Sequence, residues 1–217
     1  MGLKQDQLEF IFSCIDQKYS QYPGLRMLEL GNQVLKIDGT RRSAKPYFEE
    51  MGFEHVSVDI NGKDGALPID LSVSIGDTLK KQYDVVTNSG FSEHVEPFRS
   101  QYQCFKNIHD FVRVGGLMIH AVPHRDHYPN HCRFYYDENF FRYLSELNDY
   151  HILDLRVIRS GKLVCAGLVK QHDQEFTRLA REVRKHIIIQ PCARKTAPRT
   201  WRARAMNYIE RLKEVFV

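Results

Sequence analysis

Short apolar segments alternate with segments of helical periodicity along most of this chain, and this alternation narrows the possible folds more than any other feature. The segments expected to be strands are residues 25–31, 55–60, 67–71, 83–88 and 117–122. The segments expected to be helices are residues 4–18, 41–51, 74–81, 97–113 and 137–147. Such alternation is typical of an open, mostly parallel sheet with helices on both faces. We therefore predict an α/β, Rossmann-like, doubly wound fold.

The end of this pattern differs from its beginning. Two more strands are expected at residues 150–158 and 162–170, with Ser160 and Gly161 at the link between them. A link this short indicates an antiparallel hairpin, which we place at the edge of the parallel sheet. The predicted sheet thus has seven strands, and with the N-terminal helix it forms one domain over residues 1–172.

The basic charge of the chain is concentrated near its C-terminal end. The whole chain carries +4, but residues 178–213 hold eleven Lys and Arg against two acids, so the rest sums to −5. We assign residues 173–217 to a helical appendage, with helices over 177–186 and 200–216. It either binds phosphate groups of nucleic acid, nucleotide-sugar or lipid, or packs as an amphipathic hairpin on the domain or on a second copy of the chain. The packing interpretation is favoured, because the basic stretch has few aromatic residues that could stack on bases and no RNA-reading motif. Trp201 is the lone tryptophan of the chain.

The number of cysteines and the length of the apolar segments indicate the cellular compartment in which the protein works. The chain has five cysteines, an odd number, and no pair has C-x-x-C spacing. A disulfide framework is therefore not expected, and we predict a reducing, cytoplasmic setting. No apolar run approaches the roughly 20 residues of a membrane span, and the charged start lacks a signal-peptide core.

A glycine and an acid end two neighbouring strands of the predicted sheet. Gly31 follows the first strand and Asp59 ends the second. In doubly wound sheets, ligands bind beyond the carboxyl ends of the strands. A glycine lets the backbone turn tightly beside a ligand, and a carboxylate there is placed to accept hydrogen bonds from two ribose hydroxyls. Together, the two residues favour a nucleoside-binding site over the ordinary alternatives, which are a simple turn at Gly31 and a helix cap at Asp59.

The first loop narrows the choice of nucleoside. After Gly31, the positions of a G-x-G-x-x-G fingerprint hold Gln33 and Lys36, and no G-x-x-x-x-G-K-[ST] segment occurs. Acidic Glu29 would repel a pyrophosphate but suits a cationic ligand. S-adenosylmethionine, which has a sulfonium and an ammonium group, fits these signs.

Five ordered segments resemble class I S-adenosylmethionine-dependent methyltransferases, nearest the broad small-molecule group labelled type 11. The resemblance covers roughly residues 23–170. The matching segments are Glu29-Leu30-Gly31-Asn32-Gln33, Asp59, Ile69-Asp70-Leu71-Ser72, Tyr83-Asp84-Val85-Val86 with Glu93-His94-Val95, and Val112-Arg113-Val114-Gly115-Gly116. The sequence departs from the family pattern at Gln33, which replaces the second glycine of the first motif.

The resemblance and the strand ends together suggest the residues that hold the cofactor. The resemblance implies that Asp59 binds the ribose and that the segment around Asp70 and Leu71 contacts the adenine. The full set of candidate cofactor-binding residues is Glu29, Gly31, Asn32, Gln33, Asp59, Ile60, Asp70, Leu71, Asn88 and Ser89.

The acceptor side is expected after the fifth strand, where four histidines occur in twelve residues. We predict that residues 123–135 form one wall of the acceptor pocket. His120 and His124 are the first candidates for a base, because histidine exchanges protons near neutral pH. Glu93 and His94, after the fourth strand, are the alternatives.

The same loop also has the side chains of a metal site. His124, His127, His131 and Cys132, with Asp126, are metal-ligand types at close spacing. No second ligand pair stands elsewhere at a recognisable spacing, so we predict no metal.

Two functions follow from these features. The first is methyl transfer from S-adenosylmethionine to a small-molecule acceptor, with a sugar or polysaccharide precursor suggested by the family resemblance. The alternative is a methyltransferase-like module that binds nucleic acid through the basic tail, with little or no catalysis. A nucleic acid methyltransferase is disfavoured, because Asn88-Ser89-Gly90-Phe91 stands where an N-P-P-Y signature is expected.

Overall fold

A six-stranded sheet forms the centre of the molecule in the computed structural model, which describes residues 2–77, 79–125, 127–159, 162–177, 179 and 181–190. The strand order is β5-β2-β6-β7-β10-β9. These strands are β2 (Arg26–Leu30), β5 (Glu54–Val58), β6 (Tyr83–Ser89), β7 (Val112–Pro123), β9 (Tyr150–Ile158) and β10 (Leu163–Lys170). The first four pair in parallel, and β10 pairs antiparallel with both β7 and β9. The predicted doubly wound sheet and its antiparallel edge hairpin are therefore confirmed.

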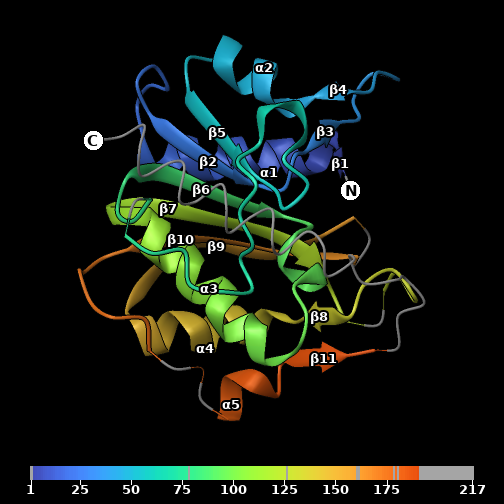
Figure 1. Ribbon diagram of the computed structural model, residues 1–217, viewed down its shortest axis with the longest axis vertical. Coiled ribbons are helices and arrows are strands. Elements are labelled where there is room, and N and C mark those ends of the chain that lie inside the picture. The colour runs from blue at the N-terminus through green and yellow to red at the C-terminus, as the bar shows by residue number, and fades with distance from the viewer. Residues whose placement is uncertain are drawn as a thin grey trace.

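Helices cover both faces of the sheet (Figure 1). On one face lie α1 (Gln5–Lys18) and α2 (Ala44–Glu50), and on the other lie α3 (Arg99–Phe111) and α4 (Glu138–Asn148). Successive strand residues alternate between the two cores: Val85 packs under α1 and α2, whereas Val86 packs under α3 and α4. This is the period of two expected of a strand that is buried on both faces. No helix among the described residues is long and apolar enough to cross a bilayer.

The predicted seventh strand, residues 67–71, is absent from the sheet. Leu67 makes only an isolated bridge with Val58. Pro68 has no N–H to donate, and the Asp70 carboxylate accepts a bond from the backbone N–H of Ser72 at 2.9 Å, which is a turn and not a ladder bond. The prediction of a seventh strand at residues 67–71 was therefore wrong.

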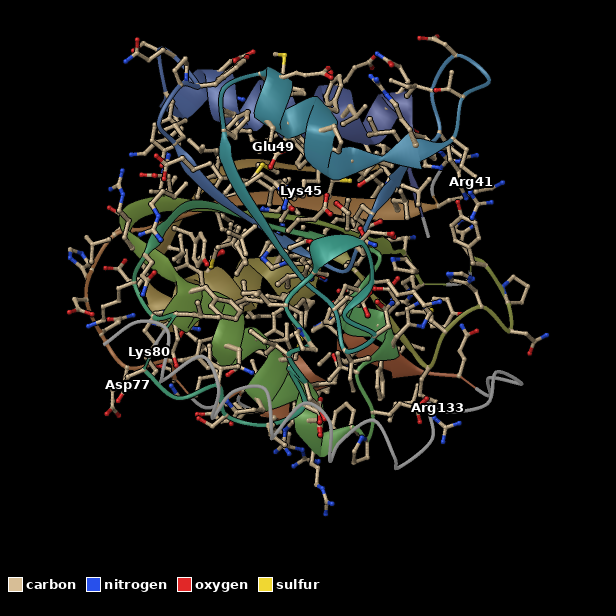
Figure 2. All side chains as sticks on the ribbon, turned by 45° about the horizontal axis from the view of Figure 1, so that its top comes forward. Arg41, Lys45, Glu49, Asp77, Lys80 and Arg133 are labelled. Atoms are coloured by element: carbon tan, nitrogen blue, oxygen red, sulfur yellow. The ribbon has the colours of Figure 1, made fainter. Side chains whose placement is uncertain are left out.

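The described residues of the predicted helix over 74–81 also form no helix. Gly76 and Lys81 have positive φ angles of 70° and 54°, which a right-handed helix excludes. Asp77 and Lys80 instead form a surface ion pair, with 2.7 Å between Oδ1 and Nζ (Figure 2).

Small elements that the sequence did not predict surround the sheet. The chain forms β3 (Val34–Leu35) and β4 (Arg42–Ser43) before α2, and β3 also pairs with β1 (Gly2–Leu3). Figure 2 shows Arg41, next to β4, at the periphery of the molecule. The 3-10 turns are η1 (Lys63–Gly65) and η2 (Ser92–His94), and β8 (Phe134–Tyr136) pairs with β11 (Ile187–Ile189).

The described start of the predicted appendage packs on the domain. Phe176, Leu179, Val183 and Ile187 belong to the core under α3 and α4. Among the described residues of the predicted helix over 177–186, the helical ones form α5 (Arg181–Arg184). The predicted helix over 200–216, and with it most of the basic tail, lies outside the described residues.

Candidate active site

The carboxyl ends of β5, β2, β6 and β7 meet at one edge of the sheet. Leu30 pairs with Val58 on one side and with Asn88 on the other, and Asn88 pairs with His120. This register brings together the loops that follow all four strands. The predicted site residues at those strand ends therefore converge, as the strand order requires.

Gly31 takes a conformation that only glycine adopts readily. Its φ angle is +80°, and its N–H donates to the Val58 carbonyl oxygen at 2.7 Å. A Cβ atom at this position would lie 2.9 Å from Gln33 Nε2 and 3.2 Å from the Phe91 ring. The glycine thus allows the first loop to turn back over the end of β2.

Asp59 ties the loop after β2 to the loop after β5. Its half-buried carboxylate accepts bonds from the backbone N–H groups of Asn32 at 3.2 Å and Asn61 at 3.0 Å. The Asn32 side chain crosses the same gap and donates to Asp64 Oδ2 at 2.7 Å. An ionised carboxylate offers about four acceptor positions, so Asp59 retains the capacity to accept ribose hydroxyls.

Glu29 does not face the strand-end edge as a free acid. It is 1% exposed, and Oε1 accepts the backbone N–H of Gln33 at 3.0 Å. Its Oε2 lies 3.8 Å from Nε2 of His55, a buried ring stacked on Phe48. The side chain therefore holds the first loop from within the core, and the expected attraction of a cationic ligand has no structural support at this residue.

Gln33 fills the space that the missing second glycine would leave open. Its Nε2 donates to the carbonyl oxygens of Ser89 at 2.8 Å and Leu30 at 3.2 Å, so it bridges the ends of β6 and β2. Its Oε1 and the Ser89 Oγ are buried without a hydrogen-bond partner among the described residues. Buried polar atoms are normally satisfied, so these two atoms leave unused hydrogen-bonding capacity at the strand-end edge.

The predicted adenine segment is a loop rather than a strand end. Asp70 is half-buried beside its turn to Ser72, and Ile60 is half-buried after Asp59. Leu71 is buried, and its carbonyl oxygen accepts a bond from Asn107 Nδ2 at 3.2 Å. An α3 side chain thus holds this loop against the domain.

A buried hydrogen-bond network fixes η2 on the other side of the edge. Asn88 Oδ1 accepts the Ser92 N–H at 3.1 Å, and Asn88 Nδ2 lies 3.0 Å from Ser92 Oγ. Gln101 Nε2 donates to the carbonyl oxygens of Ser92 and Val95 at 2.9 and 2.7 Å. The Tyr136 hydroxyl donates to Gln101 Oε1 at 2.7 Å. Asn88, predicted to bind cofactor, therefore serves η2 in this structure.

His120 lies in the core and not at a proton-transfer site. It is 1% exposed and packs against Phe105 and Phe141, with Nδ1 3.1 Å from Asn88 Nδ2. Burial lowers the pKa of His120 to about 3, so the ring is neutral at physiological pH. The expectation that it is a base poised near neutrality therefore does not fit its surroundings.

Glu93 and His94 come together with His131, a loop residue that was not among the predicted catalytic residues. One possible ligand atom from each lies within 4.8 Å of the others. Glu93 is fully buried, and burial raises the pKa of its carboxyl group to about 8. The sequence signals for His131 were the density of histidines in its loop and its place among the metal-ligand residue types there.

His124 stands apart from that group in its contacts. Its Nε2 lies 3.2 Å from Glu138 Oε2, at the first turn of α4, and its backbone bridges to Tyr136. Cys132, another residue of the loop, is buried and directs its Sγ to the Phe134 carbonyl oxygen at 3.3 Å. Among the described residues of this loop, His124 and Cys132 thus make contacts different from those of His131.

Comparison with solved structures identifies the type of fold. The chain is similar to Burkholderia thailandensis 1,6-didemethyltoxoflavin-N1-methyltransferase, solved with 1,6-didemethyltoxoflavin and S-adenosylhomocysteine, over 77% of this chain and 78% of the other, at 16% identity and a TM-score of 0.58. A TehB-like SAM-dependent methyltransferase from Corynebacterium glutamicum matches over 73% and 86%, at 14% identity and 0.52. The chain has the class I methyltransferase fold.

A third neighbour of this fold is geranyl diphosphate C-methyltransferase from Streptomyces coelicolor A3(2), solved with Mg²⁺, geranyl diphosphate and S-adenosylhomocysteine. It matches over 75% of this chain and 78% of its own, at 11% identity and a TM-score of 0.53. No protein-family model matches the sequence, and comparison with curated proteins finds no relative. The similarity to these neighbours is therefore a similarity of fold.

Proposed function

We propose that this protein transfers a methyl group from S-adenosylmethionine to a small-molecule acceptor. The observation that carries the proposal is the junction of β2, β5 and β6, where Gly31, Asp59 and two unsatisfied polar atoms converge in a class I methyltransferase fold. When bound, the cofactor supplies an electrophilic methyl group on a sulfonium. Asp59 would hold the ribose, and the segment with Ile60, Asp70 and Leu71 would border the adenine.

Gln33 and Ser89 would bind the amino-acid part of the cofactor. Gln33 Oε1 and Ser89 Oγ are buried, have no partner within the described part of the chain, and belong to two residues that a hydrogen bond joins. An amide oxygen accepts hydrogen bonds and a hydroxyl both donates and accepts. These atoms therefore suit the ammonium and carboxylate groups, and the first loop recognises the cofactor without the usual second glycine.

The acceptor would lie beside η2 and the loop between β7 and β8. Glu93, His94 and His131 gather there, whereas His120 stays inside the core. Methyl transfer requires mainly that the acceptor atom be held in line with the methyl group, and η2 is held on several sides. Glu93 and His94 thus remain our candidates to orient the acceptor or its proton.

Calorimetric titration of the purified chain with S-adenosylhomocysteine tests the cofactor assignment. We expect one binding site per chain, with no comparable binding of NAD⁺ or ATP, because no phosphate-cradling glycine loop is present. Failure to bind S-adenosylhomocysteine would remove the methyltransferase proposal.

The acceptor class is tested separately, with S-adenosylmethionine labelled in its methyl group. We predict transfer to a sugar or a polysaccharide precursor, and heteroaromatic compounds serve as the comparison set. Label recovered only on the heteroaromatic compounds would overturn the sugar assignment but leave the transferase function in place.

A further inference from the structure

The group of Glu93, His94 and His131 has the spacing of metal ligands rather than of hydrogen-bonded partners. Glu93 Oε1 lies 3.8 Å from His94 Nε2, and the rings of His94 and His131 are 5.4 Å apart at an angle of 71°. A separation of 3.8 Å is too long for a hydrogen bond. Two nitrogen or oxygen ligands on one tetrahedral zinc ion stand about 3.3 Å apart. Within the described part of the chain, this is the one set of three such side chains at this spacing.

The Glu93 carboxyl group lacks a hydrogen-bonding counterpart among the residues that the structure describes. The residue is 0% exposed, and neither Oε1 nor Oε2 has a hydrogen-bond partner there. A buried carboxylate without compensation is strongly unfavourable, so such groups pair, bind a metal or take up a proton. A cation between Glu93 and the two imidazoles would meet this requirement, and a proton is the alternative that an experiment has to separate.

The backbone that carries Glu93 is held rigidly. Asn88 and Gln101 bind η2 from two sides, and Tyr136 bonds to Gln101 and lies 3.2 Å from Ser92 Oγ. The second imidazole comes from the loop before β8, the strand that contains Tyr136. Supported ligands on short, fixed elements are what a metal site needs.

We propose that Glu93, His94 and His131 bind one divalent transition-metal ion of the zinc or cobalt type. Two imidazoles and one carboxylate form the ligand set of many catalytic zinc sites, which keep a position open for water or substrate. Calcium and magnesium are disfavoured because they prefer oxygen ligands. His94 has a side chain 35% exposed and so gives the ion a route from solvent.

Metal binding itself does not depend on the cofactor. The use of the ion does rest on the proposed function: an ion here would polarise an acceptor oxygen beside the transfer site as a Lewis acid. The first measurement is therefore made without S-adenosylmethionine, so that the site and the reaction fail or succeed separately.

The test is titration of EDTA-treated, tag-free protein with CoCl₂, followed by visible absorption, and with ZnCl₂, followed by calorimetry. We expect one ion per chain. Glu93→Gln and His131→Ala should each weaken binding at least about 100-fold, because loss of even an outer-shell partner costs about 10- to 100-fold. Thermal melts of both variants establish that they fold.

His127→Ala is the matched control, since it removes a histidine from the same loop but outside the group. We expect its metal affinity to stay within about twofold of wild type, because half-buried His127 packs against His124 and is not one of the three ligands. The proposal is overturned if wild type binds no ion, or if His127→Ala or His124→Ala weakens binding as much as His131→Ala. A wild type that binds no ion and is less stable than Glu93→Gln would assign a proton to Glu93 instead. Titration of the EDTA-treated wild type with S-adenosylhomocysteine tests the transferase proposal independently.

Discussion

The two halves of the strand-end edge satisfy their acids in opposite ways. Beside β2 and β5, the Asp59 carboxylate accepts bonds from the backbone N–H groups of Asn32 and Asn61. Beside β6 and β8, the Glu93 carboxylate is buried and finds no hydrogen-bond partner in the described ranges of the chain. Asp59 in the first half is therefore satisfied by the fold itself, and we call this the cofactor half. The second half, which we call the acceptor half, holds an acid that requires a cation or a proton.

The two halves should therefore respond to different substitutions. In the cofactor half, the turn at Gly31 and the side chains of Gln33 and Asp59 hold the loops in place. In the acceptor half, side chains such as Gln101 and Tyr136 hold η2 in place. Substitutions at Gly31 and Asp59 should thus affect the first half, and substitutions in the side-chain network around η2 the second.

The largest effect is expected at Gly31. Gly31→Val forces a β-branched residue to φ +80° and places a Cβ 2.9 Å from Gln33 Nε2 and 3.2 Å from the Phe91 ring. We expect loss of S-adenosylhomocysteine binding by at least about 100-fold, since both the loop and the ligand space change. Calorimetry measures the affinity, and circular dichroism follows the fold.

Gly24→Val is a control with nearly the same backbone strain. Gly24 has φ +82°, a Cβ there would meet no described atom within 4 Å, and the residue precedes β2 at the opposite end of that strand. Both variants should lose stability, but only Gly31→Val should lose the ligand. Equal losses of affinity would mean that strain alone, and not the site, explains the effect.

The sequence predicted the strand ends well, because a glycine or an acid directly after an apolar segment marks the point where a strand ends. Gly31 and Asp59 lie where the strand pattern placed them. The seventh strand was wrong because Pro68 and the Asp70 turn compete with ladder bonds, and both are visible only as weak local signals. Residue type could not distinguish core His120 from loop residue His131, because burial depends on how the strand of the first and the loop of the second pack in three dimensions.

The burial of His120 should make the stability of the fold depend on pH. The pKa of His120 falls from an unfolded value of about 6.5 to about 3 in the folded chain because of burial. Between these values the unfolded state binds more protons, so stability is full above pH 6.5 and falls as pH drops toward 3. At pH 4 the loss from this group is about 3 kcal/mol.

His120→Gln removes this titration and keeps a polar partner for Asn88. We expect its free energy of unfolding, measured by urea melts, to fall less steeply between pH 6.5 and pH 4 than that of wild type. His151→Gln, at an exposed histidine, should follow the wild-type slope. A His120→Gln slope equal to that of wild type would show that His120 is not the buried neutral group.

A smaller effect is expected at Asp59. Asp59→Ala removes the acceptor for ribose hydroxyls and should weaken S-adenosylhomocysteine binding by about 1.5–3 kcal/mol, the value of a hydrogen bond to a charged group. Asp64→Ala is the control, because exposed Asp64 accepts a bond from the Asn32 side chain at 2.7 Å and so tethers the same loop without ending a strand. Calorimetry on both variants separates ribose binding from loop tethering. Equal affinities for wild type and Asp59→Ala would place the ribose elsewhere.

The smallest effect is expected at Tyr136, and it separates the two halves most clearly. Tyr136→Phe deletes the hydroxyl that donates to Gln101 Oε1 at 2.7 Å and lies 3.2 Å from Ser92 Oγ. The net loss of one buried hydrogen bond is about 1 kcal/mol in unfolding free energy. Because η2 carries Glu93, cobalt affinity should fall by about tenfold, as for an outer-shell partner.

The cofactor half shares none of these bonds, so the affinity of Tyr136→Phe for S-adenosylhomocysteine should stay within about twofold of wild type. Tyr143→Phe, which removes a hydroxyl from a residue 40% exposed, controls for loss of a phenol as such and should change neither affinity. Parallel losses of cobalt and S-adenosylhomocysteine binding in Tyr136→Phe would mean that the two halves form one cooperative unit. A loss confined to cobalt would mean that the side-chain network around η2 supports the acceptor half alone, as its hydrogen bonds indicate.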